Sequence, residues 1–238
     1  MEKLNMLYEG KAKKVYATDD EKLYIVDYKD DATAFNGLKK GTIAGKGVTN
    51  NKMSNIIFKY LEENGVKTHF VKELSPTETL VKKVSIVPLE VIVRNVAAGS
   101  FSKRFGVKEG TVLNSPTLEF CYKNDDLGDP MINDYQIYAL GLATKEEIKT
   151  ISDMAFKINT LMVEFFKKIN IRLIDFKIEF GRCDEGIILA DEISPDTCRL
   201  WDAKTNTKLD KDRFRQDLGN VEEAYDEVFR RVSDTDNQ

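Results

Sequence analysis

The sequence predicts an α+β protein with two lobes, on three observations. The first half is mostly short β-branched and aromatic segments separated by turn residues, a pattern typical of strands. The second half holds a long amphipathic helix, a strand hairpin and two further helices. Charged clusters occur on both sides of residues 85–88. We therefore expect an N-terminal, mainly β lobe over residues 1–85 and a C-terminal α+β lobe over residues 86–238.

Strands dominate the first half. Segments such as KKVYAT and KLYIVDY are rich in β-branched and aromatic residues, and the polar triplet DDE between them is a turn. By the same signals, the expected strands span residues 13–18, 22–28, 68–74, 78–87 and 89–95. Residues 31–47 are rich in Gly, Lys and small side chains, so we expect a surface loop there.

The only helix expected in the first half spans residues 51–65. Its apolar side chains recur at helical spacing, and Gly65 ends the pattern. The residues of this stripe are Met53, Ile56, Ile57, Tyr60 and Leu61. A stripe of this kind predicts one buried face.

The second half opens with a short helix over residues 97–106, a strand near 118–123 and a loop over 123–134. The longest helix follows, over residues 144–170, and Thr144 with Glu147 forms a capping-box pattern at its start. Its expected core stripe is Ile148, Ile151, Met154, Ile158, Leu161, Met162, Phe165 and Phe166. A hairpin over residues 172–194 comes next, and two helices, DKDRFRQDL and VEEAYDEVFRRV, end the pattern.

Composition limits the class of function. The formal net charge of −4 does not favour a general nucleic-acid binder. The stretch VSIVPLEVIV is far shorter than the roughly 20 apolar residues that span a membrane. The three cysteines, Cys121, Cys183 and Cys198, have no C-x-x-C spacing, and the first ten residues carry no apolar signal region. We therefore expect a soluble, cytoplasmic protein that binds neither nucleic acid nor membrane, whereas local basic clusters remain able to bind small phosphorylated ligands.

The hairpin carries charges on one face. In LIDFKIEFG the apolar residues point one way, and Asp175, Lys177 and Glu179 point the other. A turn at 184–186 would pair Cys183 with Ile187 and set Glu179 directly across from Asp191. Like charges so placed destabilise a sheet unless a cation such as Mg²⁺ lies between them. The alternative is a solvated face on which water and Lys177 screen the pair.

Four further segments are candidates for binding phosphate. In LYEGKAKKVY, Gly10 precedes Lys11 and Lys13 on the strand face of Val15; the alternative is a solvated basic strand edge. In VRNVAAGSFSKRFG, Arg94 ends a strand, and Ser100 lies near a helix start, where free N–H groups bind anions. The alternative there is a plain helix cap with a surface ion pair.

The third and fourth candidate segments follow the hairpin. SPDTCRLWD supplies Asp196 and Arg199, and DRFRQDLG supplies Arg213 and Arg215; both could instead form structural ion pairs. His69, the single histidine, falls in a predicted strand far from these clusters, so we expect it to be structural. Without a second histidine or a C-x-x-C pair, zinc chemistry and histidine-based triads are disfavoured.

Taken together, these motifs resemble the SAICAR synthetase family of purine biosynthesis. The resembling segments are LYEGKAKKVY, IVPLEVIVRNVAAGS, LIDFKIEFG, LADEISPDTCRLWD and DKDRFRQDLG, in order from about residue 7 to residue 232. The resemblance implies a two-lobed, ATP-grasp-like fold with ATP in the cleft between the lobes. It also implies a ligase that joins L-aspartate to the carboxylate of carboxyaminoimidazole ribonucleotide (CAIR), giving SAICAR, ADP and phosphate. An acyl phosphate, Mg²⁺ and a homodimer are expected with it.

The resemblance also implies roles for individual residues. Lys177, Glu179 and Asp191 would form the catalytic centre, with Glu179 and Asp191 as Mg²⁺ ligands. ATP would be bound by Lys11, Lys13, Val15, Lys82, Ile86 and Lys123. The substrate would be bound by Arg94, Ser100, Asp129, Asp196, Arg199 and Arg215.

One position departs from the family pattern. Some members have Asp-Gly where this chain has Asn36-Gly37, so the residues that bind L-aspartate stay unassigned. Two rival functions share the same motifs, a small-molecule kinase and a non-catalytic nucleotide sensor. Each predicts a different fate for ATP, and that difference separates them by experiment.

Overall fold

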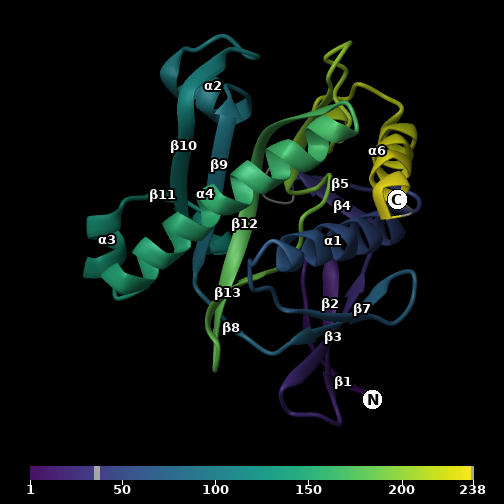
Figure 1. Ribbon diagram of the computed structural model, residues 1–238, viewed down its shortest axis with the longest axis vertical. Helices are drawn as coiled ribbons and strands as arrows, with labels where there is room; N and C mark the ends of the chain where they lie inside the picture. Colours follow the sequence, from purple (N-terminus) through teal and green to yellow (C-terminus); the bar gives the residue numbers. More distant parts are fainter. Residues whose placement is uncertain (35–37, 237–238) are drawn as a thin grey trace.

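Two antiparallel β-sheets flank the helix α1 (Lys46–Glu63) in the computed structural model, which describes residues 1–34 and 38–236 (Figure 1). The structure mixes helix and sheet, as the α+β prediction requires. The Asn36-Gly37 position, where the sequence departs from the family pattern, lies outside the described residues.

The first sheet has the strand order β1-β2-β3-β7-β6, and all neighbours are antiparallel. Its strands are β1 (Lys3–Glu9), β2 (Lys13–Thr18), β3 (Leu23–Tyr28), β6 (Phe70–Glu73) and β7 (Glu78–Lys82). The expected strands at 13–18 and 22–28 are confirmed. β1 was not predicted; it is an edge strand whose seven residues are all exposed.

The second sheet is organised around one long strand, β12 (Ile171–Cys183). Its first half pairs with β14 (Cys198–Asp202) and β9 (Leu89–Val96), and its second half with β13 (Gly186–Ala190) and β8 (Ser85–Ile86). Beyond β9 the sheet continues through β10 (Val112–Tyr122) to β11 (Met131–Ile132). The single strand expected over residues 78–87 is thus two strands, because β7 and β8 belong to different sheets.

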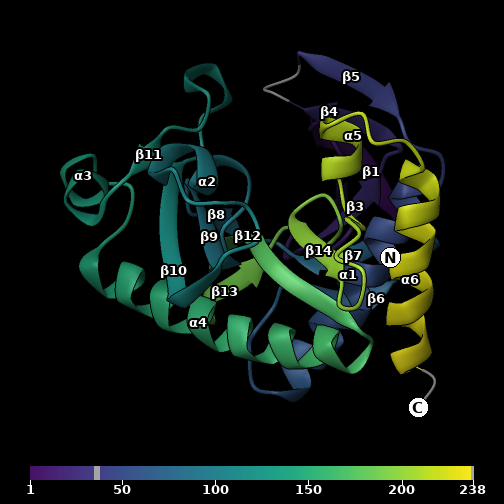
Figure 2. The same ribbon diagram turned by 90° about the horizontal axis from the view of Figure 1, so that it is seen from above.

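Helix α4 (Lys145–Lys168) lies across the second sheet, as both views show (Figures 1 and 2). Its capping box is present: the Thr144 hydroxyl accepts from the Glu147 N–H at 3.1 Å, and the Glu147 carboxylate accepts from the Thr144 N–H at 2.8 Å. The remaining helices are α2 (Gly99–Phe105), α3 (Asp134–Ala139), α5 (Asp212–Arg215), α6 (Val221–Asp236) and the short 3₁₀ turn η1 (Asp125–Leu127). The sequence did not predict α3.

The main hydrophobic core lies between α4, α1, α6 and the second sheet. The predicted α4 stripe is buried, except that Met154 and Leu161 are only partly buried at its edge. Met53, Ile57 and Leu61 of α1 belong to the same core as Phe166 of α4. One continuous core therefore connects segments on both sides of residue 85.

The expected surface loop over residues 31–47 is wrong in two places. β4 (Asp31–Ala34) and β5 (Lys39–Thr42) pair as a small antiparallel ribbon, and α1 begins at Lys46, five residues earlier than predicted. Phe214 packs against this ribbon: a Cβ built on Gly41 would approach its ring at 3.1 Å. Tertiary packing therefore orders a segment whose composition favours a loop.

The predicted register of the hairpin is also wrong. Cys183 pairs with Gly186, not with Ile187, so the turn contains two residues, and Ala190 is the residue across from Glu179. Gly186 has φ 92°, a left-handed value that glycine adopts without strain. Every pair of the hairpin is thus shifted by one residue from the prediction.

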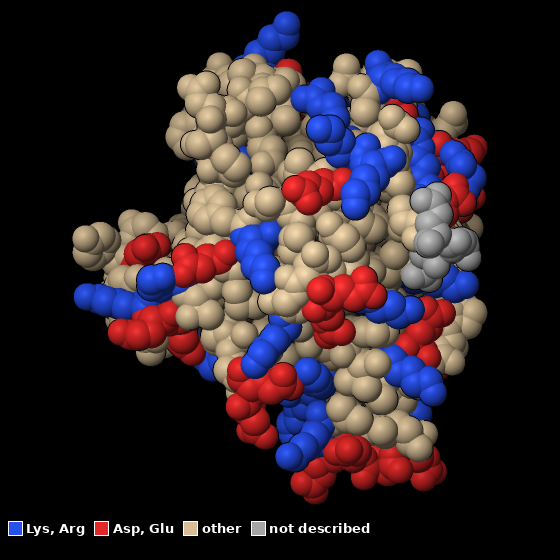
Figure 3. All heavy atoms as spheres, viewed as in Figure 1, with Lys and Arg blue, Asp and Glu red and all other residues tan. Residues whose placement is uncertain are grey.

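Among the described residues, no helix is both long enough and apolar enough to cross a membrane. On the face shown in Figure 3, basic and acidic side chains are interspersed over the surface.

Candidate functional site

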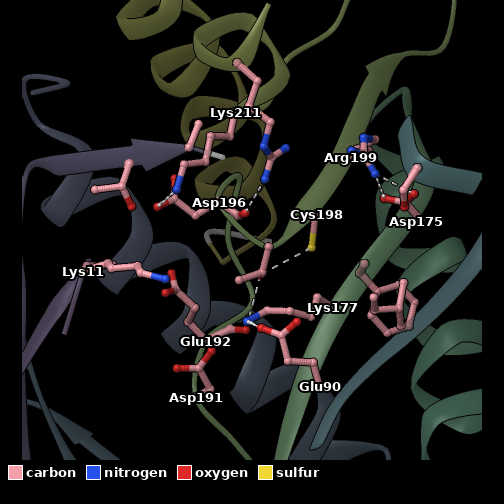
Figure 4. Close-up of a pocket in the computed structure, with 18 of the residues that line it drawn as sticks. Lys11, Glu90, Asp175, Lys177, Asp191, Glu192, Asp196, Cys198, Arg199 and Lys211 are labelled. Atoms are coloured by element: carbon pink, nitrogen blue, oxygen red, sulfur yellow. Dashed lines mark hydrogen bonds and ion pairs between the residues drawn. The ribbon is translucent and has the colours of Figure 1, made fainter. Parts of the chain in front are cut away.

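Two adjoining cavities lie between the two sheets. The larger, of about 600 Å³, runs from β2, β3 and β7 to β12. The smaller, of about 390 Å³, reaches towards β9, β14 and α5 and is the cavity drawn in Figure 4. They share a wall made by Lys11, Ala12, Glu90, Lys177, Asp191 and Glu192. Ligands in the two cavities would therefore meet at this shared wall.

Every residue to which the resemblance assigns a role lines one of these cavities, whereas the candidate Arg213 lines neither. The larger cavity is lined by Lys11, Lys13, Val15, Lys82, Ile86, Lys123, Asp129, Lys177, Glu179 and Asp191. The smaller cavity is lined by Lys11, Arg94, Ser100, Lys177, Asp191, Asp196, Arg199 and Arg215. Segments far apart in the sequence thus converge on one place, although their individual roles stay predictions.

The larger cavity has an apolar end and a charged end. Its apolar lining comes from the first sheet and the chain that follows it, namely Val15, Tyr24, Val26, Val81, Val84 and Ile86. Val15 and Val26 are cross-strand partners, so β2 and β3 present one apolar surface there. Four lysines gather at the other end, Lys11, Lys13, Lys123 and Lys177. An apolar slot next to clustered lysines suits a flat base that carries phosphates.

Lys13 is largely enclosed, since only 15% of its side chain is exposed. Its ammonium group forms ion pairs with Asp191 and, at 3.1 Å, with Glu192. Burial alone would lower the pKa of Lys13, but the charges of Asp191 and Glu192 outweigh burial and raise this pKa well above its usual value. Lys13 therefore stays positive at neutral pH and crosses from the first sheet to the end of β13.

Asp191 reaches the cavity by a different route from the one predicted. Because Ala190 is across from Glu179, simple alternation would direct residue 191 to the opposite face. Asp191 instead has φ 64°, in the left-handed region that few non-glycine residues adopt. This local backbone breaks the alternation, so Asp191 and Glu179 line the same cavity despite the shifted register.

Glu179 lies between two lysines. Its carboxylate accepts from Lys123 Nζ at 2.8 Å and from Lys177 Nζ at 3.2 Å, and only 4% of its side chain is exposed. Lys177 also donates to Glu90 at 2.8 Å. Burial alone would lower the pKa of Lys177, but Glu179, Asp191 and Glu90 together raise it. Lys177 is therefore a fixed positive charge at the junction of the two cavities.

The smaller cavity is lined by three arginines from three elements. Arg94 on β9 contacts Asp175 at 2.5 Å and Glu119 at 3.0 Å, and its Nη2 donates to the Ser100 hydroxyl at 3.2 Å. Only 3% of its side chain is exposed, so the surface ion pair weighed as an alternative for Arg94 is excluded. Arg199 and Arg215 line the same cavity from β14 and α5.

Asp196 anchors the other side of the smaller cavity. Its carboxylate accepts from Lys46 at 3.1 Å, from Lys211 at 3.2 Å and from the Tyr225 hydroxyl at 2.5 Å. Burial alone would raise the pKa of Asp196, but Lys211 and Lys46 lower it well below its usual value. The ionised Asp196 therefore ties α1, α5 and α6 to the loop that follows β13.

The sequence led us to expect His69 far from the charged clusters, and this expectation is wrong. His69 lines the larger cavity. The chain around it hydrogen-bonds to β13: its N–H donates to the Leu189 carbonyl at 2.9 Å. Burial lowers the pKa of His69 to about 4, and the charge of Lys13 adds to this effect. The imidazole is therefore neutral at physiological pH.

The acidic residues of the larger cavity could hold a magnesium ion together with a ligand. Within residues 1–34 and 38–236, no cluster of three or more His, Cys, Asp or Glu side chains is arranged to hold a metal by itself. Mg²⁺, however, usually binds one or two carboxylates and completes its shell with phosphates and water. Glu179 and Asp191 supply ionisable oxygen donors of this kind at the lysine-rich end, so the donor chemistry fits.

Several residues that line the two cavities were not predicted from the sequence. Glu90, Glu192 and Lys211 were not singled out, and Asp175 was noted only as a charge on the hairpin face. Glu90 lies within an apolar run, LEVIV, and a carboxylate at an inward-facing strand position is the signal that could have identified it. Glu192 directly follows Asp191, so the unusual backbone there was needed to place it.

Comparison with known proteins identifies relatives over nearly the whole chain. A sequence model of the SAICAR synthetase family matches residues 6–232. Phosphoribosylaminoimidazole-succinocarboxamide synthase of Lachnoclostridium phytofermentans is 69% identical, over 98% of this chain and 99% of that protein. The enzyme of the same name from Caldanaerobacter subterraneus is 65% identical, with the same coverage of both chains.

Solved structures give the same result. The phosphoribosylaminoimidazole-succinocarboxamide synthase of Ehrlichia chaffeensis has a TM-score of 0.94 at 47% identity, covering 96% of this chain and 98% of that one. A SAICAR synthetase in complex with ADP has a TM-score of 0.93 at 51% identity, covering 96% of this chain and 97% of that one. The fold of this chain is therefore the fold of those structures.

Proposed function

The chain belongs to the SAICAR synthetase family, and from this premise we propose how its two cavities divide the reaction between them. The chain is an ATP-dependent ligase of purine biosynthesis: it joins L-aspartate to the carboxylate of CAIR and gives SAICAR, ADP and phosphate. The observation that supports this assignment of one substrate to each cavity is the shared wall. There a nucleotide in the larger cavity would meet a ribonucleotide in the smaller one.

In this proposal ATP occupies the larger cavity. The base lies at the apolar end, against Val15 and Ile86, and the phosphates point towards Lys11 and Lys13. Lys82, the last residue of β7, lines the same cavity. The ADP complex of a 51% identical relative supports a nucleotide site in this fold. Lysines that stay protonated stabilise the negative charge of the transferred phosphoryl group.

CAIR occupies the smaller cavity, with its phosphate near Arg94, Ser100, Arg199 and Arg215. Guanidinium groups pair with phosphate through two parallel hydrogen bonds, which favours arginine at such a site. With its phosphate held there, CAIR directs its carboxylate to the shared wall and Lys177. Asp196 lines the same cavity, and Lys123 with Asp129 lies on the nucleotide side of the wall.

The chemistry takes place at the shared wall in two steps. An oxygen of the CAIR carboxylate attacks the γ-phosphorus of ATP, ADP leaves, and an acyl phosphate forms. The amine of L-aspartate then attacks the acyl carbon, inorganic phosphate leaves, and the nitrogen loses a proton as the amide forms. Lys177, held positive by Glu179, Asp191 and Glu90, stabilises the negative charge on the oxygens in both steps.

We propose Glu179 and Asp191 as the ligands of Mg²⁺. When bound there, Mg²⁺ would neutralise charge on the nucleotide phosphates. In the structure both carboxylates are paired with lysines, so cations already balance this pair. A bound metal ion would supply part of the positive charge that the lysines supply in this structure. This is consistent with a metal site that is complete only when the nucleotide adds its phosphate oxygens.

The domain division, the oligomer and the location of the protein are also proposals. Residues 1–85 would cover ATP, and residues 86–238 would bind the substrate and metal.

A homodimer is supported by the exposed apolar residues Leu4, Met6 and Leu7 on the edge strand β1, which are 43–48% exposed. Light scattering on the purified protein would measure its mass. A cytoplasmic location is supported by the free thiols of Cys121, Cys183 and Cys198.

One experiment separates the ligase from its rivals. The purified protein is incubated with Mg-ATP and CAIR, with and without L-aspartate, and ADP and all imidazole products are quantified. The ligase predicts ADP release that depends on aspartate and matches the amount of SAICAR formed. A stable phosphorylated product would favour the kinase, and binding without turnover the sensor. The relatives favour neither rival, because the proteins that match over nearly their full length are named as phosphoribosylaminoimidazole-succinocarboxamide synthases.

A further inference from the structure

Five charged side chains form an alternating chain along the smaller cavity. Arg94 contacts Asp175, Asp175 also contacts Arg199 at 2.9 Å, Arg199 contacts Asp212 at 2.7 Å, and Asp212 contacts Arg215 at 2.7 Å. The arginines come from β9, β14 and α5, and the two aspartates between them are buried. Figure 4 shows the Asp175–Arg199 contact at one side of the cavity. Each aspartate thus fixes two arginines relative to one another.

Asp212 holds one arginine with each of its two carboxylate oxygens. Its two oxygens are used separately, Oδ2 for Arg199 Nε and Oδ1 for Arg215 Nη1, and only 1% of its side chain is exposed. A buried carboxylate is costly unless it is paired, so both arginines are needed to keep it charged. The Asp212 N–H is in turn held by Asp210 at 2.8 Å, which fixes the start of α5. Asp212 itself does not line either cavity.

The position of Arg199 is restricted on its remaining side as well. With Nε on Asp212 and Nη1 on Asp175, its Nη2 lies beside Gly99, where an added Cβ would come within 2.4 Å of that nitrogen. Gly99 has φ 54° and precedes Ser100, which already contacts Arg94. Arg199 is therefore oriented towards the same corner of the cavity as Arg94 and Ser100.

We propose that Asp212 is a positioning residue, which orients Arg199 and Arg215 for the phosphate of the ribonucleotide. The inference rests on the proposed placement of CAIR. Long arginine side chains lose rotamer freedom when they bind a ligand, and a partner that has already fixed them reduces this cost. Without Asp212 the two arginines would still be present and charged, but they would no longer be held together.

A purely electrostatic role for Asp212 predicts the opposite result. Asp212 is negative, so its removal by Asp212→Asn would by itself strengthen the attraction of the cavity for a phosphate dianion. Positioning predicts weaker binding. The sign of the change in KM for CAIR therefore distinguishes the two roles.

The experiment compares CAIR with its riboside, which lacks the phosphate, in the wild type, Asp212→Asn and Asp202→Asn. Asp202 is the matched control, since it pairs with Arg231 at 2.7 Å and neither residue lines a cavity. For Asp212→Asn we expect KM for CAIR to rise by about 10- to 100-fold, with KM for ATP within about threefold of wild type. The ratio of kcat/KM for CAIR to that for the riboside should fall in the same proportion. Asp202→Asn should leave this ratio unchanged.

Three results would overturn the proposal. They are a KM for CAIR that falls or does not change, a loss that is equal for CAIR and its riboside, and a rise confined to KM for L-aspartate. If Asp212→Asn does not fold, as judged by circular dichroism, Asp212→Glu provides the same comparison, because it keeps the charge but moves the carboxylate by one methylene. A wild-type protein that forms no SAICAR would refute the proposed function instead, before any variant is compared.

Discussion

Glu179 on β12 and Asp191, the residue directly after β13, face one cavity, although the residue across the sheet from Glu179 is Ala190. The left-handed backbone at Asp191, with φ 64°, brings its carboxylate to the side that Glu179 occupies. Both carboxylates raise the pKa of Lys177, so the three groups act on one another. A strained backbone conformation at a non-glycine residue persists only where its surroundings fix it, and such residues cluster at functional sites.

The first prediction concerns this pair of carboxylates. Glu179→Gln and Asp191→Asn should each lower kcat/KM with Mg-ATP by at least about 100-fold, because a lost carboxylate weakens metal and phosphate binding together. Asp191→Asn should remain folded, since asparagine tolerates the left-handed region. The control is Asp184→Asn in the hairpin turn, whose side chain is 95% exposed. Variants that keep full activity and an unchanged Mg²⁺ requirement would show that these carboxylates do not bind the metal.

The second prediction concerns the packing behind the nucleotide. A Cβ on Gly181 of β12 would approach Val84 within 2.4 Å, and Val84 lines the larger cavity. Gly181→Ala should therefore push Val84 inward, raise KM for ATP by about 5- to 50-fold and destabilise the fold by about 1–3 kcal/mol. The double variant Gly181→Ala/Val84→Ala should recover much of the affinity for ATP, because it restores the volume. Steady-state kinetics and thermal unfolding measure both effects, and an unchanged KM for ATP would argue against a base in this position.

The third prediction follows from the neutral, buried His69. Its pKa of about 4 in the folded protein lies below the ordinary value of 6.5, so the unfolded chain takes up the proton first as pH falls. The stability contributed by the neutral form is complete above pH 6.5 and is lost as pH falls towards 4. Between pH 7.5 and 5, wild type should lose about 2 kcal/mol of unfolding free energy relative to His69→Gln.

The difference between the two proteins, measured by urea unfolding, is the informative quantity. The pKa of Asp210 is raised to about 7 by burial and by the adjacent charge of Asp212, so the folded state gains stability as Asp210 takes up a proton over the same pH range. Asp210 is unchanged in both proteins, and its contribution cancels in the comparison. Parallel pH curves for wild type and variant would contradict the account of His69.

The fourth prediction separates stability from function. Thr144→Ala removes the hydroxyl that caps α4 and should lower the unfolding free energy by about 1 kcal/mol. KM values for all three substrates should stay within about twofold of wild type, because Thr144 lines neither of the two adjoining cavities. Thr150→Ala, in the interior of the same helix, is the matched control and should cost less. An equal cost at both positions would mean that the capping box does not stabilise this helix.

Some of this structure could be predicted from the sequence, because local pattern alone determines it. The α4 stripe and the Thr144 cap depend on residues within one helix, and both are present as expected. Turn length in the hairpin depends on the backbone angles that Gly186 adopts, and the pattern of apolar residues does not specify them. The register was therefore missed by one residue, although the hairpin itself was found.

Contacts between distant segments account for the other differences. The β4–β5 ribbon is held by Phe214 against Gly41 and by Lys39 with Asp217, and none of these contacts can be read from the composition of residues 31–47. His69 reaches the cavity because the chain at Thr68 pairs with Leu189 of β13. Most residues that line the cavities were found through motifs spread over the whole chain. Glu90 and Asp212 lie within two of those motifs but were not singled out, because the sequence pattern does not show that they pair with Lys177 and with Arg199.

The most direct test of the account follows an oxygen atom across the shared wall. CAIR labelled with ¹⁸O in its carboxylate is converted to SAICAR with Mg-ATP and L-aspartate, and the released phosphate is analysed by mass spectrometry. If the carboxylate attacks the γ-phosphorus where the two cavities meet, one ¹⁸O should appear in each phosphate that is released. Phosphate without label would contradict both the acyl phosphate and the proposed meeting of nucleotide and ribonucleotide at Lys177.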